Sequence, residues 1–308
     1  MIKVMQAFVR TGAHDQQVKL VEMPIPEIDE NEVLVKVQAF GVGLQERYFI
    51  PQNTLFPYVI GTEASGVIIK TGVRVTRFKV EERVILTSVL QLKGGCWAEY
   101  VAVPQDALIP LPSKMSFVEG AAIPIAGKTA LESMRALNLK SGDTLFIAGA
   151  SGAIGTLVIQ LATAQGIIVI GSASQKNHSY MLSLGAQKAV DYSGPNWAQR
   201  LKQWIPEGVT AALAIQPGTV EDSMDLVKDG GTVITVSGDD HVKPKSDISV
   251  CQIQHHTDTK EALIRLISDI SVGYIQLVIE RIYPFQQALE ALKKTETRHA
   301  RGKSVVRV

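Results

Sequence analysis

A glycine-rich turn between two apolar segments is the part of the sequence whose residue types and spacing point most directly to chemistry. Ala150, Gly152 and Gly155 occupy the three small-residue places of the pattern G-x-G-x-x-G, with alanine in the first place. In such a turn one small residue permits the sharp bend, the next lets backbone N–H groups approach phosphate oxygens, and the third lets a helix press against the sheet. The pattern predicts a dinucleotide pyrophosphate site, and an ordinary loop is the alternative.

The segments on either side of the turn favour the dinucleotide site. An apolar run at 144–148 predicts a buried strand before the turn, and apolar residues at helical spacing follow it as far as residue 162. Gly166 then ends the helix, and 167–170 supplies a second apolar strand. This order is the βαβ unit that the pattern requires. The predicted cofactor contacts in the turn are Gly149, Ala150, Ser151, Gly152, Ala153, Ile154 and Gly155.

The residues after the second strand indicate which dinucleotide binds. An NAD enzyme usually places Asp or Glu there to accept a hydrogen bond from the ribose 2′-OH, whereas a 2′-phosphate favours small hydroxyls and a cation. The segment 171–176 has no carboxylate and contains Ser174 and Lys176. We therefore predict NADPH, with an ordinary solvated role for Lys176 as the alternative. Ser237 and Gly238 follow the predicted strand 232–236 and are further candidates, because ligands of open α/β sheets collect at strand ends.

Length and composition limit the class of protein. The 308 residues predict two domains, and the 46% hydrophobic content is enough for two cores. A net charge of +1 without a dense block of Lys and Arg argues against nucleic-acid binding and favours a small-molecule partner. Polar residues and glycines interrupt the apolar region 144–173, so we expect no membrane span there. The first residues lack a secretory pattern, so we expect a cytoplasmic protein.

The cysteines and histidines do not favour a metal site. Cys96 and Cys251 are the two cysteines of the chain, and their separation offers neither a disulfide framework nor a pair of metal ligands. We expect both to be small buried hydrophobic residues. His255 and His256 are adjacent, and neighbouring side chains of a strand point to opposite faces, so a shared metal is not expected.

The predicted elements change in kind along the chain. Up to residue 110, short strands separated by Pro, Gly and charged turns predict a barrel-like antiparallel domain. From residue 144, helices alternate with apolar strands, which is typical of a parallel sheet covered on both faces. We expect strands at 18–21, 33–37, 66–69, 83–86, 100–103, 144–148, 167–170, 211–215, 232–236, near 279 and at 304–308, and helices at 119–136, 153–165, 197–205, 220–227, 262–270 and 285–292.

Short motifs in a consistent order span nearly the whole chain, at 32–37, 61–67, 94–101, 121–130, the glycine turn and 300–306. Together they resemble the medium-chain dehydrogenase/reductase superfamily, in its zinc-independent quinone oxidoreductase-like branch. The resemblance implies an α/β fold: a GroES-like β-barrel substrate domain at 1–117 and 272–308, and a Rossmann doubly wound parallel-sheet domain at 118–271 that binds NADP. It also implies a homodimer. By the same resemblance, Thr129 lies near the nicotinamide and Tyr192 beside the adenosine phosphate.

The resemblance also suggests which metal and substrate contacts are missing. Zinc-dependent relatives use an early cysteine and the histidine of a Gly-His-Glu segment as ligands. Here the corresponding segment is Gly61-Thr62-Glu63, the loop 41–44 has no cysteine, and two cysteines cannot form a four-cysteine structural zinc lobe. We therefore expect neither zinc site. Many quinone reductases also have an asparagine in contact with cofactor or substrate where this chain has Gly43, so we expect an altered quinone pocket.

The reaction that the resemblance implies is hydride transfer from NADPH to a quinone or to the β-carbon of an α,β-unsaturated carbonyl. The protein must position this acceptor and offer a hydrogen-bond donor to the oxygen on which charge develops. Tyr48 is the candidate donor, because relatives place a substrate-pocket tyrosine after this loop; simple packing beside Phe49 and Phe56 is the alternative. An enoyl-thioester reductase and a non-catalytic, crystallin-like NADPH-binding protein are the other functions that stay open.

Overall fold

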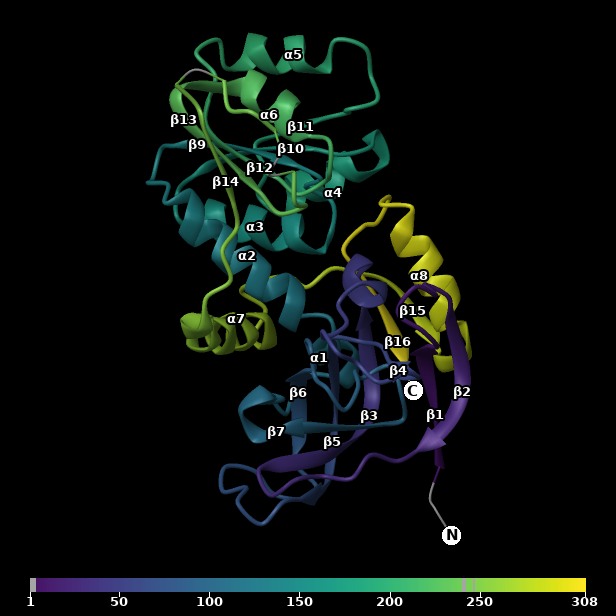
Figure 1. Cartoon of the computed structure of the whole chain (residues 1–308). Coiled ribbons are helices and arrows are strands. Elements are labelled where there is room, and N and C mark those ends of the chain that lie inside the picture. The colour runs from purple at the N-terminus through teal and green to yellow at the C-terminus, as the bar shows by residue number, and fades with distance from the viewer. Residues whose placement is uncertain (1–3, 240–241, 246) are drawn as a thin grey trace. The chain divides into compact units, whose positions relative to one another are not determined.

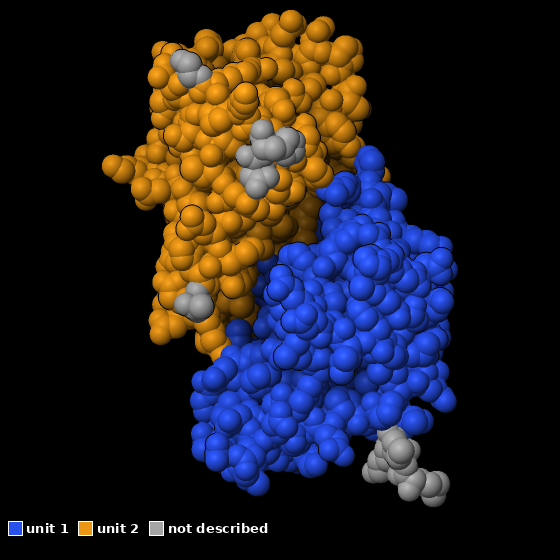
Figure 2. Space-filling model, in the orientation of Figure 1, with its two compact units in different colours: residues 1–125, 279–308 blue, residues 126–278 orange. Residues whose placement is uncertain are grey.

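The computed structural model describes residues 4–239, 242–245 and 247–308. Contacts divide the chain into two compact units: unit 1 is Met1–Ile125 with Ile279–Val308, and unit 2 is Ala126–Val278. Figure 1 shows the elements and Figure 2 colours the two units separately. The predicted domain limits, at 117/118 and 271/272, stay a prediction.

The described part of unit 1 contains two sheets. Their ladders are antiparallel, as predicted for the first part of the chain, except that the two C-terminal strands pair in parallel. The five strands predicted between residues 18 and 103 are confirmed, and several are longer than expected. The smaller sheet has the order β2 (Val18–Pro24), β1 (Val4–Arg10), β4 (Tyr58–Val59). The larger sheet has the order β15 (Ile279–Pro284), β16 (Lys303–Arg307), β3 (Glu32–Val42), β5 (Glu63–Thr71), β6 (Arg83–Thr87), β8 (Leu108–Pro110). In the larger sheet β7 (Tyr100–Pro104) also pairs with β3.

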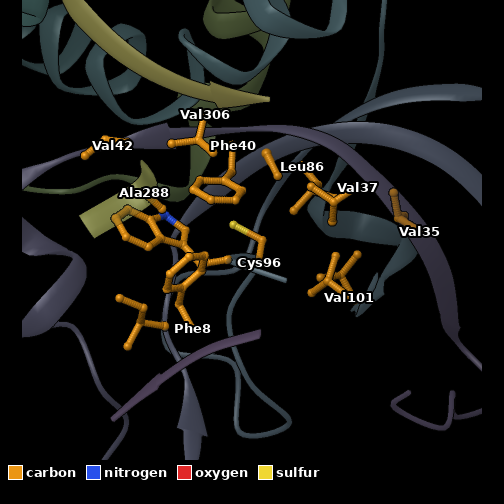
Figure 3. Close-up of a cluster of buried hydrophobic side chains, with 14 of the residues drawn as sticks. Phe8, Val35, Val37, Phe40, Val42, Leu86, Cys96, Val101, Ala288 and Val306 are labelled. Carbon is orange, nitrogen blue, oxygen red and sulfur yellow. The ribbon is translucent and has the colours of Figure 1, made fainter. Parts of the chain in front are cut away.

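An aromatic core lies inside unit 1 (Figure 3). The rings of Phe40 and Trp97 stack with their centroids 4.9 Å apart. The rings of Phe8 and Phe285 meet edge to face, with their centroids 5.1 Å apart. Cys96 is fully buried in this core, as predicted, and burial raises the pKa of its thiol, which therefore stays neutral. The same prediction is wrong for Cys251, which is exposed because it lies on the edge strand of the other unit's sheet.

The prediction of one helix at 119–136 is wrong. This part of the chain forms two helices, α1 (Phe117–Ala121) and α2 (Pro124–Leu137). Ser116 begins α1 with a capping box, in which its side chain and that of Glu119 bond to each other's backbone N–H. The break precedes Pro124, which has no N–H to continue a helix but is favoured in the first turn of the next one. Residues 122 and 123 therefore separate the two helices.

Unit 2 contains, within its described residues, a six-stranded parallel sheet. Its strand order reverses between the neighbouring strands β9 and β12, and this is the doubly wound order of two mononucleotide-binding halves. Such sheets bind ligands at the carboxyl ends of the strands, at the point of reversal. The order is β11 (Lys188–Val190), β10 (Ile168–Ser172), β9 (Thr144–Ala148), β12 (Val209–Ala214), β13 (Val227–Thr235), β14 (Ser249–Gln252).

Helices cover both faces of this sheet, with α5 and α6 on one side and α2 and α3 on the other (Figure 1). The ring of Trp197 stacks on that of Phe146 at 5.9 Å and fixes α5 to the sheet. The expected helices after residue 136 are confirmed, although residues 285–287 form a 3₁₀ turn before α8. The remaining bounds are α3 (Ala153–Ala164), α4 (His178–Ser183), α5 (Trp197–Trp204), α6 (Val220–Leu226), α7 (Lys260–Ser271) and, in unit 1, α8 (Ala288–Glu296). No helix in the described ranges is long and apolar enough to cross a membrane.

Candidate functional site

The predicted glycine turn lies at the carboxyl end of β9, beside the point where the strand order reverses. Gly149 has a φ of +88°, a left-handed conformation that favours glycine. A Cβ atom at this position would lie 2.8 Å from Cγ of Gln216, which follows β12. The N–H of Ala150 donates to the Ser172 carbonyl at 3.1 Å, at the end of β10. The end of β10 therefore holds the turn by a hydrogen bond, and Gln216 after β12 leaves room only for glycine at position 149.

The two later small residues of the pattern have different surroundings. A Cβ atom on Gly155 would lie 2.6 Å from backbone atoms of Ala150, so glycine lets α3 lie directly against the turn. A Cβ atom on Gly152 would meet, within 4 Å in the described structure, only the Gly149 carbonyl oxygen, at 3.6 Å. Gly155 is thus required by packing, whereas Gly152 leaves open space.

The N-terminus of α3 faces the same turn. Gly152 is its N-cap residue, and no side chain of the described structure caps this 12-residue helix. The first N–H groups of a helix lack intrahelical partners and carry partial positive charge, so they bind anions. Ala153 and Ile154 are half-buried in this first turn, and the carbonyl of buried Ser151 accepts a hydrogen bond from the Tyr180 hydroxyl at 2.5 Å. An open glycine before an uncapped helix fits a phosphate group.

The residues predicted to bind a 2′-phosphate follow β10 and β11, which are parallel neighbours. Ser174 is half-buried and its hydroxyl accepts a hydrogen bond from the Asn177 amide at 3.3 Å. Lys176 and Tyr192 are exposed, so both are accessible to a ligand. Asn177 was not predicted from the sequence. Its buried side-chain amide holds Ser174, and its spacing of three residues from Ser174 was the available signal.

The other predicted cofactor residues lie elsewhere in unit 2. The Ser237 hydroxyl donates to Oδ2 of Asp239 at 3.4 Å, and the same oxygen accepts the Gly218 N–H at 2.8 Å, which joins the loops after β13 and β12. Gly238 has a φ of +80°. Thr129 is buried on α2. The carboxyl edge of one sheet therefore brings together the glycine turn, Ser174, Tyr192, Ser237 and Gly238, whereas Thr129 lies on a helix of the same unit.

Tyr48 lies in unit 1, directly after the 3₁₀ turn η1 (Leu44–Arg47). Its side chain is 59% exposed, and that of Phe49 is 47% exposed. Its N–H donates to the Gln45 carbonyl at 2.8 Å, which closes the turn. The phenol therefore projects from an ordered backbone rather than filling the core, and this exposure favours a ligand-binding role over simple packing.

Arg47 anchors the turn that carries Tyr48. Its Nε and Nη2 bond to the two carboxylate oxygens of Glu296 on α8, at 2.5 and 3.3 Å. Its Nη1 donates to the Gln16 carbonyl at 3.0 Å, and the buried Arg10 donates to the Arg47 carbonyl at 2.9 Å. These bonds tie η1 to α8 and to the segment after β1.

The substitution Arg47→Lys is expected to lower the free energy of unfolding by about 1–3 kcal/mol, because an ammonium cannot replace the two-pronged contact with Glu296. Urea denaturation measures the change. Arg74→Lys is the matched control, since Arg74 and its partner Glu30 are both largely exposed and such pairs contribute little. Equal losses in the two variants would contradict the anchoring role.

A buried acidic cluster lies at one end of the larger sheet of unit 1. Glu63 on β5 forms an ion pair with Lys303 on β16. Glu46 in η1 is 1% exposed and accepts a hydrogen bond from the Thr62 hydroxyl at 3.0 Å. Burial raises the pKa of Glu46 to about 8, and the nearby positive charge of Lys303 opposes this shift without cancelling it. Glu46 is therefore a neutral acid near pH 7. This cluster was not predicted from the sequence.

The buried carboxylates Glu63 and Glu132 are engaged by other protein groups. Besides Lys303, Glu63 has the Ile125 N–H as a donor, at 2.7 Å. Buried Glu132 on α2 contacts Nδ1 of His255 at 2.7 Å and accepts the His256 N–H at 2.9 Å. Within the described ranges, no group of three or more His, Cys, Asp or Glu residues is arranged to hold a metal ion.

Comparison with known proteins agrees with this architecture. The family model for the alcohol dehydrogenase GroES-like domain matches residues 29–113, and that for the zinc-binding dehydrogenase matches residues 184–306. The quinone oxidoreductase of Sus scrofa is 30% identical over 93% of this chain and 91% of its own length. The chloroplastic NADPH-dependent alkenal/one oxidoreductase of Arabidopsis thaliana is 29% identical over 92% of this chain and 73% of its own length. The solved quinone oxidoreductase of Coxiella burnetii is 28% identical, with a TM-score of 0.86 over 99% of this chain and 100% of that one.

A GroES-like unit and a doubly wound sheet with a phosphate-fitting turn define an oxidoreductase of the medium-chain dehydrogenase/reductase type. The similarity along almost the full length is to quinone oxidoreductases, and the chain belongs to the quinone oxidoreductase-like branch of that superfamily. The fold expected from the sequence is thereby confirmed. The zinc in the name of one matching model describes that family, whereas this chain has Thr62 at the place of the expected histidine ligand.

Proposed function

We propose that the protein is a zinc-independent, NADPH-dependent reductase that delivers a hydride to a quinone or to the β-carbon of an α,β-unsaturated carbonyl. The observation that carries the proposal is the open glycine turn at the uncapped end of α3, followed after β10 by a segment without a carboxylate. The relatives named as quinone and alkenal/one oxidoreductases support this acceptor class. They favour it over an enoyl-thioester reductase or a non-catalytic NADPH-binding protein.

Unit 2 supplies the cofactor contacts in this proposal. NADPH, when bound, provides the hydride. The backbone N–H groups of the turn hold the pyrophosphate, and Ser174 and Lys176 bind the 2′-phosphate. Beside these groups, Tyr192 flanks the adenosine phosphate and Thr129 lies near the nicotinamide, while Ser237 and Gly238 complete the cofactor site at the end of β13.

Tyr48 positions the acceptor and donates a hydrogen bond, or a proton, to its oxygen. Conjugation spreads the negative charge that develops on a quinone or an enone, so a phenol suffices where alcohol oxidation would need a Lewis acid. Because the Tyr48 side chain is 59% exposed, water can restore its proton after each turnover. The ordered turn η1 holds the phenol in place.

The substitution Lys176→Ala is expected to raise the dissociation constant for NADPH about tenfold and to leave that for NADH unchanged, because Lys176 faces the 2′-phosphate that NADH lacks. Fluorescence titration with each cofactor measures both constants. Lys202→Ala is the control, since Lys202 is an equally exposed lysine in the last turn of α5. An equal weakening for both cofactors would contradict the assignment.

An acceptor screen tests the proposed function. Purified protein is mixed with NADPH or NADH and a panel of quinones, enals and enones, and the loss of reduced nicotinamide is followed by absorbance. We expect oxidation of NADPH in preference to NADH with at least one conjugated acceptor. NADPH that binds but is oxidised by none of them would count against the enzyme and for a binding protein.

We further propose a homodimer in the cytoplasm. Edge strand β14 of unit 2 carries no neighbour on its outer side in the described structure, and an unpaired strand edge can pair with a second copy. Light scattering would show twice the chain mass for a dimer and a single mass otherwise. Cell fractionation tests the location.

A further inference from the structure

Glu46 is a buried acid whose two oxygens differ in their surroundings. Oε1 accepts hydrogen bonds from the Thr62 hydroxyl at 3.0 Å and from the Gln45 amide at 3.2 Å. Oε2 is buried and has no hydrogen-bond partner among the described residues. The backbone of Gly43 is a further hydrogen-bond donor to this carboxyl group. Because the two side-chain donors point at Oε1, we assign the proton of the neutral acid to Oε2. With this assignment, Oε2 is a buried O–H donor without an acceptor.

The charges around Glu46 keep it neutral. Glu63 and Lys303 face it from β5 and β16 and neutralise each other as an ion pair, so ionised Glu46 would leave an uncompensated buried charge. Cys96 is the other titratable neighbour, and burial raises the pKa of its thiol so that it carries no charge. α8 also packs against η1, and its Glu296 is already paired with Arg47.

Gln45 and Gly43 fix the orientation of the acid. A Cβ atom on Gly43 would lie 2.6 Å from Cδ of Gln45, so glycine makes room for the carboxamide to fold back over the turn. The Gln45 Nε2 is then 3.2 Å from both the Thr62 hydroxyl and Glu46 Oε1. Gln45 and Thr62 are thus positioning residues that reserve Oε1 as an acceptor.

We propose that Glu46 supplies the proton that the reduced acceptor gains, through a water molecule held by Oε2. A buried polar atom without a partner is where an ordered water is expected. The inference rests on the proposed reductase function and names its proton source. Glu46 lies in η1, and Tyr48 is the residue that ends this turn.

The proposed step balances in atoms and electrons. The O–H bond on Oε2 breaks and its proton passes to the water, which gives one of its own protons to the α-carbon of an enone or to a quinone oxygen. Both electrons arrive with the hydride that NADPH supplies, so no other reductant is needed. Glu46 is left as a carboxylate and regains its proton from solvent. Tyr48 meanwhile donates its hydrogen bond to the acceptor oxygen.

The test compares wild-type protein with Glu46→Gln, which keeps the shape of the side chain but cannot act as an acid. We expect kcat at pH 7 to fall at least tenfold, with the dissociation constant for NADPH within twofold of wild type. Because the protonated acid is the active form, kcat of the wild type should be constant below pH 8 and fall tenfold per pH unit above it. Glu46→Gln should lose this fall.

A second variant and an activity-independent measurement keep the test decisive. Thr62→Val removes a donor to Oε1 and should lower kcat by a smaller factor, while exposed Glu22→Gln should change nothing. Infrared spectra should show a carboxylic acid carbonyl band near pH 7 that is absent in Glu46→Gln. A wild-type rate and pH profile in Glu46→Gln would overturn the proposal, as would absence of the band. Failure of wild-type protein to reduce any acceptor would instead overturn the proposed function.

Discussion

Replacing Gly152 with valine is expected to weaken NADPH binding by about 100-fold or more while the protein stays folded. The backbone at Gly152 is extended, with φ −78° and ψ 177°, which valine adopts readily. The new side chain would occupy the open space before α3 and keep phosphate oxygens from the N–H groups there. Losing two charge-assisted hydrogen bonds costs about 3 kcal/mol, which corresponds to a factor of about 100. Calorimetric titration with NADPH measures the change.

Gly12→Ala is the matched control for this variant. Gly12 lies in unit 1, and a Cβ atom there would have its nearest neighbour at 3.9 Å, so an added methyl group meets no obstacle. The control should bind NADPH as the wild type does, and both variants should keep the wild-type circular dichroism. If Gly152→Val bound NADPH within threefold of wild type, the phosphates would have to lie elsewhere.

Replacing Tyr48 with phenylalanine is expected to lower kcat about 100-fold and to leave the affinity for NADPH unchanged. In the proposed reaction the phenol of Tyr48 is the donor to the acceptor oxygen, and loss of a general acid or a positioned donor typically costs a factor of 10²–10⁴. The residues proposed to contact the cofactor belong to unit 2, whereas Tyr48 belongs to unit 1. Steady-state kinetics with the best acceptor from the screen, together with NADPH titration, separates the two quantities.

Tyr274→Phe serves as the control for the loss of a tyrosine hydroxyl, because Tyr274 is 83% exposed and lies outside the proposed site. Its kinetics should match those of the wild type. Unchanged turnover in Tyr48→Phe would remove Tyr48 as the donor and return it to simple packing beside Phe49. A parallel loss of NADPH affinity would also contradict the assigned role.

Most of the fold could be predicted because the sequence signals were local. The apolar strands 144–148 and 168–170, the turn and α3 follow from hydrophobic spacing and glycine placement alone. Five strands of the described structure escaped prediction. β4 has two residues, β8 and β11 have three each, and β14 lies at a sheet edge with mostly exposed side chains, so none of these four shows the long apolar run that marks a buried strand. β1 does contain buried apolar residues, but they form a short run beside Gln6 and Arg10. The break before Pro124 has a local signal as well, because a proline ends a preceding helix and is favoured in the first turn of the next one.

The candidate site was predictable where chemistry depends on consecutive residues. The glycine turn and the segment after β10 are of this kind, and the close packing of Gly155 against Ala150 agrees with the role assigned to Gly155. The left-handed bend, however, lies at Gly149 and not at Ala150, the first small residue of the predicted pattern. The acid cluster was not predictable, because Glu46, Glu63 and Lys303 are distant in sequence and meet only when β5, β16 and η1 assemble. The position of the Gln45 carboxamide likewise depends on the space that Gly43 leaves beside it.

The most direct test of hydride transfer without zinc is a labelling experiment on chelator-treated protein. NADPH carrying deuterium at the transferred C4 position is incubated with metal-depleted enzyme and an enone acceptor from the screen, and the product is examined by NMR. We expect one deuterium on the β-carbon of each product molecule, formed at the rate that untreated enzyme shows with the same labelled NADPH. Product without deuterium, or turnover that disappears on chelation and returns with added zinc, would contradict this expectation.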